Sequence, residues 1–168
     1  MAAEDEIIKI ACDLQPELAT LVPEKREELT TEGGLNVLDN IDKIGSAIER
    51  LHEYDIPVSL FLEPDINQID ASAEISADVI EIHTGNYANA PTEEDMVEEL
   101  DRITEAASHA KKLGLGVNAG HGLNYINMKD FINVPNIDEV SIGHALVVES
   151  LLNGFEDTIK KYVAICKP

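Results

Sequence analysis

The chain has 168 residues and a formal net charge of −21, from 12 basic and 33 acidic side chains. This excess of acid argues against a nucleic-acid-binding protein, because phosphate backbones are held mainly by lysine and arginine. No apolar run approaches the roughly 20 residues that cross a bilayer, and the acidic start MAAEDEIIKI lacks the basic segment of a signal peptide. We therefore expect a cytoplasmic protein without nucleic-acid or membrane partners. The length of the chain suits one domain, residues 1–168.

Short apolar runs and longer periodic runs alternate along the chain. Apolar runs bounded by Gly, Pro, Asp or Asn predict strands, and apolar residues three or four positions apart predict helices. In chain order the prediction is strand 17–22, helix 36–54, strand 56–62, helix 65–77, strand 78–83, helix 92–113, strand 115–120, helix 127–133, strand 138–143 and helix 149–166. Asp65 and Thr92 stand where they could cap the helices that follow them. The last helix is expected to turn Leu151, Leu152 and Phe155 toward a core.

The alternation of strands and helices predicts parallel strands with right-handed crossovers. Two architectures fit, an open doubly wound sheet and a (β/α)₈ TIM barrel. The open sheet typically carries a G-x-G-x-x-G loop after its first strand, which this sequence lacks, whereas distinctive polar residues follow several strands, as in a barrel. A whole barrel has eight strands and about 250 residues, so we expect an incomplete barrel of about five parallel strands, without the first two to three βα units.

Two Gly–His pairs follow the last two predicted strands. The first lies in Gly120-His121-Gly122 and the second is Gly143-His144. Glycine lets an anionic group approach backbone amides closely, and a helix that begins after such a loop adds a site for phosphate. A histidine beside the phosphate could transfer a proton near neutral pH. The alternative is that each glycine only shapes a tight turn.

Glu81 and His83 share one face of the predicted strand 78–83, opposite Ile80 and Ile82. A carboxylate on the inner face of a barrel is costly unless it is paired, so Glu81 indicates a site. The histidines at 83, 121 and 144 together with Glu81 also resemble a metal-binding set, an alternative that stays open. Earlier in the chain, the loop after the first strand contains a basic pair, Lys25 and Arg26, followed by two threonines.

Several segments together resemble the pyridoxine 5′-phosphate synthase family: LVPEKREELTTEGGLNV, VSLFLEPD, IEIHTGNYA, GLGVNAGHGLNY and SIGHAL. The resemblance implies a TIM barrel, a homo-oligomer, and a reaction that needs neither a metal nor an organic cofactor. It implies two catalytic residues, the proton donor His121 and Glu81, which would stabilise a transition state. It implies four substrate-binding residues: Thr30 for 1-deoxy-D-xylulose 5-phosphate, and Gly122, Gly143 and His144 for 3-amino-2-oxopropyl phosphate.

The sequence also departs from the family pattern. The motifs N-I-D-H, H-L-R-E-D and E-M-A, which carry a further catalytic histidine and glutamate, do not occur in the 168 residues. Because Met1-Ala2 aligns with the end of the last of these motifs, we expect a family member that begins at an internal methionine. Asn86 and Ile126 replace a common cysteine and histidine. Val148-Glu149 replaces Gly-Arg, and the charge of Glu149 is expected to weaken the phosphate site.

The resulting prediction is a transferase of pyridoxal phosphate biosynthesis, a pyridoxine 5′-phosphate synthase that condenses the two substrates into pyridoxine 5′-phosphate and phosphate. We expect this chain alone to have little or no activity, because catalytic groups that act as a unit cannot be removed singly without large losses. Two alternatives stay open, a non-catalytic phosphate-binding fragment and a metal-dependent barrel hydrolase that uses His83, His121 and His144.

Overall fold

The structure is a computed structural model that describes residues 1–23 and 33–166. In this part of the chain five strands form one parallel sheet in the order β1-β2-β3-β4-β5. All five predicted strands are confirmed, with ends within two residues of the expected ones. The strands are β1 (Ala19–Leu21), β2 (Val58–Leu62), β3 (Val79–His83), β4 (Gly116–Gly120) and β5 (Glu139–Ser141).

Helices connect the strands and follow the last one. They are α1 (Asp5–Leu14), a 3₁₀ turn η1 (Leu38–Asn40), α2 (Ile41–His52), α3 (Ile66–Glu74), α4 (Gly85–Ala88), α5 (Glu93–Lys112), α6 (Met128–Phe131), α7 (His144–Asn153) and α8 (Phe155–Cys166). The expected caps are confirmed: the Asp65 carboxylate accepts hydrogen bonds from the amides of Asn67 and Gln68, and the Thr92 hydroxyl accepts one from Asp95. The short helices α1 and α4 were not predicted.

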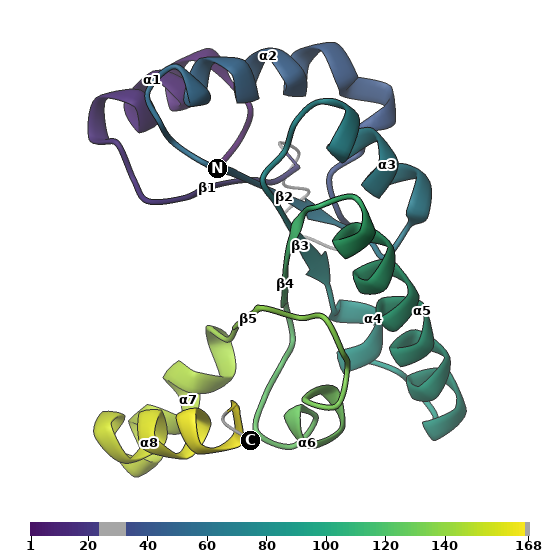
Figure 1. The fold of residues 1–168 in the computed structure, drawn as a ribbon. Coiled ribbons are helices and arrows are strands. Elements are labelled where there is room, and N and C mark those ends of the chain that lie inside the picture. Colours follow the sequence, from purple (N-terminus) through teal and green to yellow (C-terminus); the bar gives the residue numbers. More distant parts are fainter. Residues whose placement is uncertain (24–32, 167–168) are drawn as a thin grey trace.

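The strand order identifies the fold as part of a barrel. Each crossover leads to the next strand in the same sheet and in the same direction, so no reversal of strand order occurs among the described strands. A doubly wound sheet requires such a reversal, and that alternative is therefore wrong. Figure 1 shows the helices in an arc outside the sheet, from α1 and α2 at the top past α3 and α5 to α6 and α8 at the bottom. The described strands do not close into a ring, and β1 and β5 form the two edges.

The two faces of the sheet differ in chemistry. The face toward α2, α3 and α5 is aliphatic and fully buried: it contains Leu21, Leu60, Leu62, Ile80, Ile82, Val117 and Ala119. Because side chains alternate along a strand, the residues between these point to the other face. The strand register places Phe61, Glu81, Asn118 and Glu139 in one row there, and His83, Gly120 and Ser141 in the next. The predicted separation of Glu81 and His83 from Ile80 and Ile82 is confirmed.

The C-terminal region differs from the prediction. The expected single helix 149–166 is wrong, because the chain forms α7 and α8 with a break at Gly154, whose φ is +87°. The two helices pack mainly on each other, and none of the residues of α7, all of which are described, is buried. Leu151, Leu152 and Phe155, expected in a core, are 83%, 79% and 66% exposed. No helix in the described part of the chain is both long enough and apolar enough to span a membrane.

Candidate active site

The two Gly–His segments lie at the same end of neighbouring strands. Gly120, the last residue of β4, is the register partner of Ser141, the last residue of β5. Because the strands are parallel, the chain leaves both at their carboxyl ends, with His121-Gly122 after β4 and Gly143-His144 after β5. His83 ends β3 beside Gly120, so three strand ends contribute to this edge of the sheet.

His121 has a left-handed backbone conformation, with φ +85°, which for a residue other than glycine costs of order 1–3 kcal/mol. Its carbonyl lies 2.6 Å from the Thr84 hydroxyl, which also lies 2.8 Å from the carbonyl of Gly120. The Thr84 amide donates a second hydrogen bond to Gly120, again at 2.8 Å. Gly122 is also left-handed, with φ +76°, and a β-carbon there would lie 2.6 Å from that of Ala88. The segment between β4 and Gly122 is therefore held by Thr84, which links β3 to α4, and passes close to Ala88 of α4.

Two asparagines hold the chain after Gly122. The Asn127 side chain donates to the Gly122 carbonyl at 3.1 Å and accepts from the Asn124 amide at 2.8 Å. The Tyr87 hydroxyl donates to the Asn127 carbonyl at 2.6 Å. Burial, with a further contribution from the charge of Asp130, raises the pKa of Tyr87 to about 12, so this hydroxyl stays a neutral donor. These hydrogen bonds were not predicted from the sequence, because the sequence does not indicate which groups an asparagine in a loop will bind.

The side chain of Glu81 extends from β3 across the backbone of β4 toward Ser141 of β5. Its half-buried carboxyl group is hydrogen-bonded to Ser141, and a β-carbon on Gly120 would come within 2.5 Å of Glu81 Oε1. A glycine is therefore needed at position 120 for the carboxyl group to cross β4. Burial raises the pKa of Glu81, and the hydrogen bond from Ser141 opposes the shift without cancelling it. A carboxyl group of this kind can exchange protons closer to neutral pH than an exposed one.

His83 is 4% exposed and pairs with a residue that the sequence reasoning missed. Its Nδ1 lies 2.6 Å from Oε1 of Glu63, an oxygen that also accepts the Gly34 amide at 3.1 Å. Burial alone would raise the pKa of Glu63, but the hydrogen bond and charge interaction with His83, aided by the Gly34 amide, lower it. The signal that could have identified Glu63 is its position directly after β2, at the same end of the sheet as His83.

Gly143 and His144 stand at the start of α7. A β-carbon on Gly143 would meet nothing within 4 Å in the described part of the chain, so its backbone faces open space. The carboxylate of Glu149, farther along α7, accepts hydrogen bonds from Lys161 Nζ and the Tyr162 hydroxyl, each at 2.7 Å. The Glu149 carboxylate, which was expected to weaken the phosphate site, is therefore hydrogen-bonded to α8, and Lys161 compensates its charge.

Some expected site residues are not brought together. Thr30, with Lys25 and Arg26, lies outside the described residues. Within residues 1–23 and 33–166, no group of three or more His, Cys, Asp or Glu side chains is arranged to hold a metal ion. His83 instead uses Nδ1 to bind Glu63. The three histidines and Glu81 therefore do not form the metal-binding set considered above. The alternative of a metal-dependent hydrolase requires that set and is not supported by the described residues.

A family model described as "Pyridoxal phosphate biosynthesis protein PdxJ" matches residues 1–168. The chain belongs to this family. Curated relatives named pyridoxine 5′-phosphate synthase include that of Colwellia psychrerythraea, 49% identical over 160 residues, and that of a Synechocystis species, 46% identical over 161 residues. The matches cover 95% and 96% of this chain but 65% and 66% of the relatives. The chain thus spans just under two thirds of the length of these two proteins.

Solved structures show the fold of this PdxJ-family chain independently. "Native KDPGal structure" superimposes with a TM-score of 0.62 at 12% identity and covers 98% of this chain and 67% of its own. The Amycolatopsis orientalis BexX/CysO complex gives a TM-score of 0.60 at 14% identity, over 94% of this chain and 59% of its own. At such low identity the likeness concerns the fold alone.

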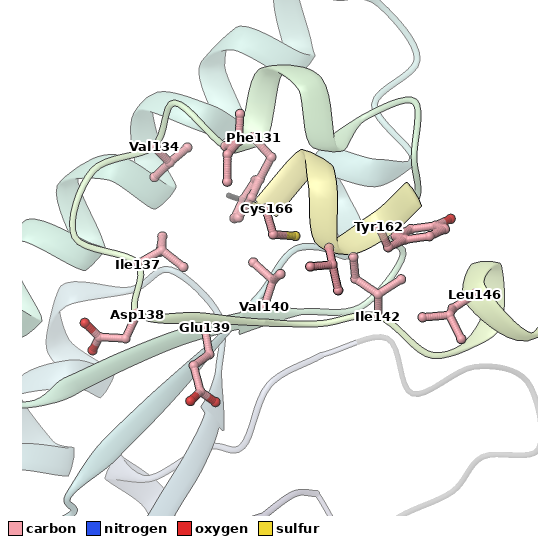
Figure 2. A pocket seen from close by; sticks show the side chains of 12 residues that line it. Phe131, Val134, Ile137, Asp138, Glu139, Val140, Ile142, Leu146, Tyr162 and Cys166 are labelled. Atoms are coloured by element: carbon pink, nitrogen blue, oxygen red, sulfur yellow. The ribbon is translucent and has the colours of Figure 1, made fainter. Parts of the chain in front are cut away.

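An apolar hollow of the described chain lies elsewhere. It has a volume of about 750 Å³ and lies between β5, the segment after α6, and α8. Figure 2 shows Val140 and Ile142 directed toward α8 and Cys166, whereas Glu139 points to the opposite side of the strand. The hollow therefore opens on the aliphatic face of the sheet, away from Glu81 and His83. It contains neither a histidine nor a glycine loop, and we do not assign the site to it.

Proposed function

We propose that this PdxJ-family protein is a pyridoxine 5′-phosphate synthase. It would condense 3-amino-2-oxopropyl phosphate with 1-deoxy-D-xylulose 5-phosphate to give pyridoxine 5′-phosphate, with loss of inorganic phosphate and water. The observation that carries the proposal is the meeting, at the carboxyl ends of β3, β4 and β5, of an imidazole, a half-buried carboxyl group and two glycine loops. Barrel enzymes place their active sites at this end of the strands.

The glycine loops would bind the phosphate of the aminoketone. The amide groups of Gly122, Gly143 and His144 are candidates for the donors, and the start of α7 adds the positive end of a helix dipole. This assignment agrees with the position of Gly143 beside open space, because a phosphate needs room close to the backbone. The binding of the second substrate by Thr30 stays a prediction.

His121 and Glu81 would carry the chemistry. An imidazole next to the bound phosphate can give a proton to an oxygen that leaves as water or phosphate. The carboxylate of Glu81 can stabilise the positive charge of an iminium group that forms when the amine condenses with a carbonyl. Both roles come from the resemblance to the family and are supported by the place of these side chains on one side of the sheet. The homo-oligomer and the cytoplasmic location also stay predictions.

A second candidate, phosphate binding without turnover, is favoured by the sequence. The family motifs that supply a further histidine and glutamate do not occur in the 168 residues, and loss of such groups typically costs several orders of magnitude in kcat. We therefore expect the chain to bind phosphorylated ligands and to form little or no product.

Calorimetry with pyridoxine 5′-phosphate, together with a turnover assay on both substrates, separates the two candidates. Saturable binding with measurable product supports the synthase, and saturable binding without product supports the second candidate. His121→Asn should abolish any turnover, whereas the control His109→Asn, on the surface of α5, should leave it unchanged. A chain that binds neither pyridoxine 5′-phosphate nor inorganic phosphate would contradict both candidates.

A further inference from the structure

We propose that Glu63 and His83 form a positioning pair that holds the imidazole of His121 in place for proton transfer. The inference rests on the proposed function for the role of His121, and it adds two residues that would not touch the substrate themselves. It starts from the only carboxylate–histidine pair of the described chain whose histidine is buried.

The contact between Glu63 and His83 fixes the tautomer of the histidine. The pKa of Glu63 is lowered, so its side chain is a carboxylate at neutral pH and can only accept hydrogen bonds. Nδ1 of His83, 2.6 Å away, must therefore carry a proton. Since Glu63 Oε1 also accepts the Gly34 amide, the carboxylate itself is held from two sides. The ring of His83 consequently has one defined orientation.

The ring of His83 then contacts the ring of His121. The two centroids lie 4.8 Å apart with the planes at 60°, an edge-to-face arrangement. On its other side His83 meets Phe61, with centroids 5.1 Å apart. The imidazole of His83 is thus enclosed between an aromatic side chain of β2 and the proposed proton donor. A change in its orientation would be transmitted directly to His121.

Gly85 completes this arrangement. A β-carbon at Gly85 would lie 2.6 Å from His83 Nε2 and 3.2 Å from His121 Cδ2, so both rings reach the same point beside the backbone of α4. Nε2 of His83 is buried and has no hydrogen-bond partner in the part of the chain that the structure describes. A buried nitrogen of this kind is costly. We attribute its retention to the requirement that the ring face His121 while Nδ1 binds Glu63.

The pair would add to the positioning of the His121 ring. The left-handed conformation at φ +85° directs its side chain, and the hydrogen bonds from Thr84 fix the backbone but not the ring. Positioning within a fraction of an ångström matters, since a misplaced catalytic group can lower the rate on the order of 100-fold. Loss of the Glu63–His83 contact should therefore lower kcat. KM should stay nearly unchanged, because the contact is not made to the amides of Gly122, Gly143 and His144 that would bind the phosphate.

The test uses the ¹⁵N-labelled chain without ligand and follows the ring signals of its five histidines by long-range ¹H–¹⁵N correlation. In the unmodified protein we expect Nδ1 of His83 to carry a proton. In Glu63→Ala we expect this pattern to be lost and the ring signals of His121 to shift and broaden. Glu63→Gln, which keeps a neutral acceptor, should give an intermediate result and serves if the alanine variant is unstable.

The matched control is Asp70→Ala. Asp70 accepts a hydrogen bond from His109 Nε2 at 2.6 Å, the same length as the Glu63–His83 contact, but on the surface. This variant should move only the signals of His109. An Nδ1 of His83 that carries no proton in the unmodified chain, or His121 signals unmoved in both Glu63 variants, would overturn the proposal. Failure of the turnover assay would overturn the proposed function and not this inference, because the ring signals do not require turnover.

Discussion

Replacing Gly120 with alanine tests whether the Glu81 carboxyl group lies over β4. The new methyl group would be 2.5 Å from Glu81 Oε1 and 2.9 Å from the β-carbon of Ser141. Ordinary van der Waals contact begins near 3.4 Å, so the Glu81 side chain has to leave its place and lose its hydrogen bond with Ser141. Overpacking of this kind typically costs about 1–3 kcal/mol.

For a chain of 168 residues, a change of 1 kcal/mol in the free energy of unfolding shifts Tm by about 2–4 °C. We therefore expect Gly120→Ala to lower Tm by about 2–12 °C, measured by circular dichroism, and to abolish any turnover that depends on Glu81. In the background of Glu81→Ala the same substitution should cost less, because the closest contact has been removed, but the contact with the β-carbon of Ser141 at 2.9 Å remains.

Gly45→Ala is the control for this experiment. Gly45 lies within α2, and the nearest atom to a new methyl group there is a side-chain carbon of Ile75 at 3.6 Å, an ordinary contact. Alanine in a helix is favoured over glycine by about 0.5–1 kcal/mol, so this variant should be more stable. If Gly120→Ala raised Tm as Gly45→Ala does, the placement of Glu81 over β4 would be refuted.

Two further predictions concern pH. Burial raises the pKa of Glu81 in the folded protein, so the ionised carboxylate lowers the free energy of unfolding at neutral pH. Glu81→Gln should therefore be more stable than the unmodified chain in urea unfolding at pH 7. The difference in the free energy of unfolding should vanish as the pH falls below about 4.5. A difference that persists at low pH would contradict this account. Hydrogen bonds from Lys111 and the Val117 amide lower the pKa of Asp138, so Asp138→Asn should cost about 1 kcal/mol at pH 7. This loss should begin to shrink as the pH falls below 3.8, where the unfolded carboxylate is protonated, and should be gone below the lowered pKa of the folded carboxylate. A constant difference from pH 7 to pH 2 would contradict that reasoning.

Local signals in the sequence were sufficient for most of the sheet. Each strand is a short aliphatic run between Gly, Pro, Asp or Asn, and the helices α3 and α5 begin at side chains, Asp65 and Thr92, that cap them without help from the rest of the fold. The choice of a barrel also followed from the sequence, because chemically distinctive residues came after several strands rather than in one glycine-rich loop.

Pairings between distant residues could not be read in the same way. The sequence indicated that Glu81 and His83 face one side, but not that Glu63 binds His83, because the register of β2 against β3 decides that contact. Apolar periodicity also gave a wrong prediction at the C-terminus. It showed that Leu151 and Leu152 are apolar, but it did not show whether another part of the chain buries them. The break at Gly154 separated the helix that the periodicity had predicted as one.

The central claim is that the glycine loops after β4 and β5 bind phosphate beside His121. The most direct test is a titration of the ¹⁵N-labelled chain with inorganic phosphate, followed through the backbone amide signals. The account predicts that the amides of Gly122, Gly143 and His144 shift together and reach saturation. Saturable shifts confined to other parts of the chain, such as the hollow beneath α8, or no saturable shift at all, would contradict it.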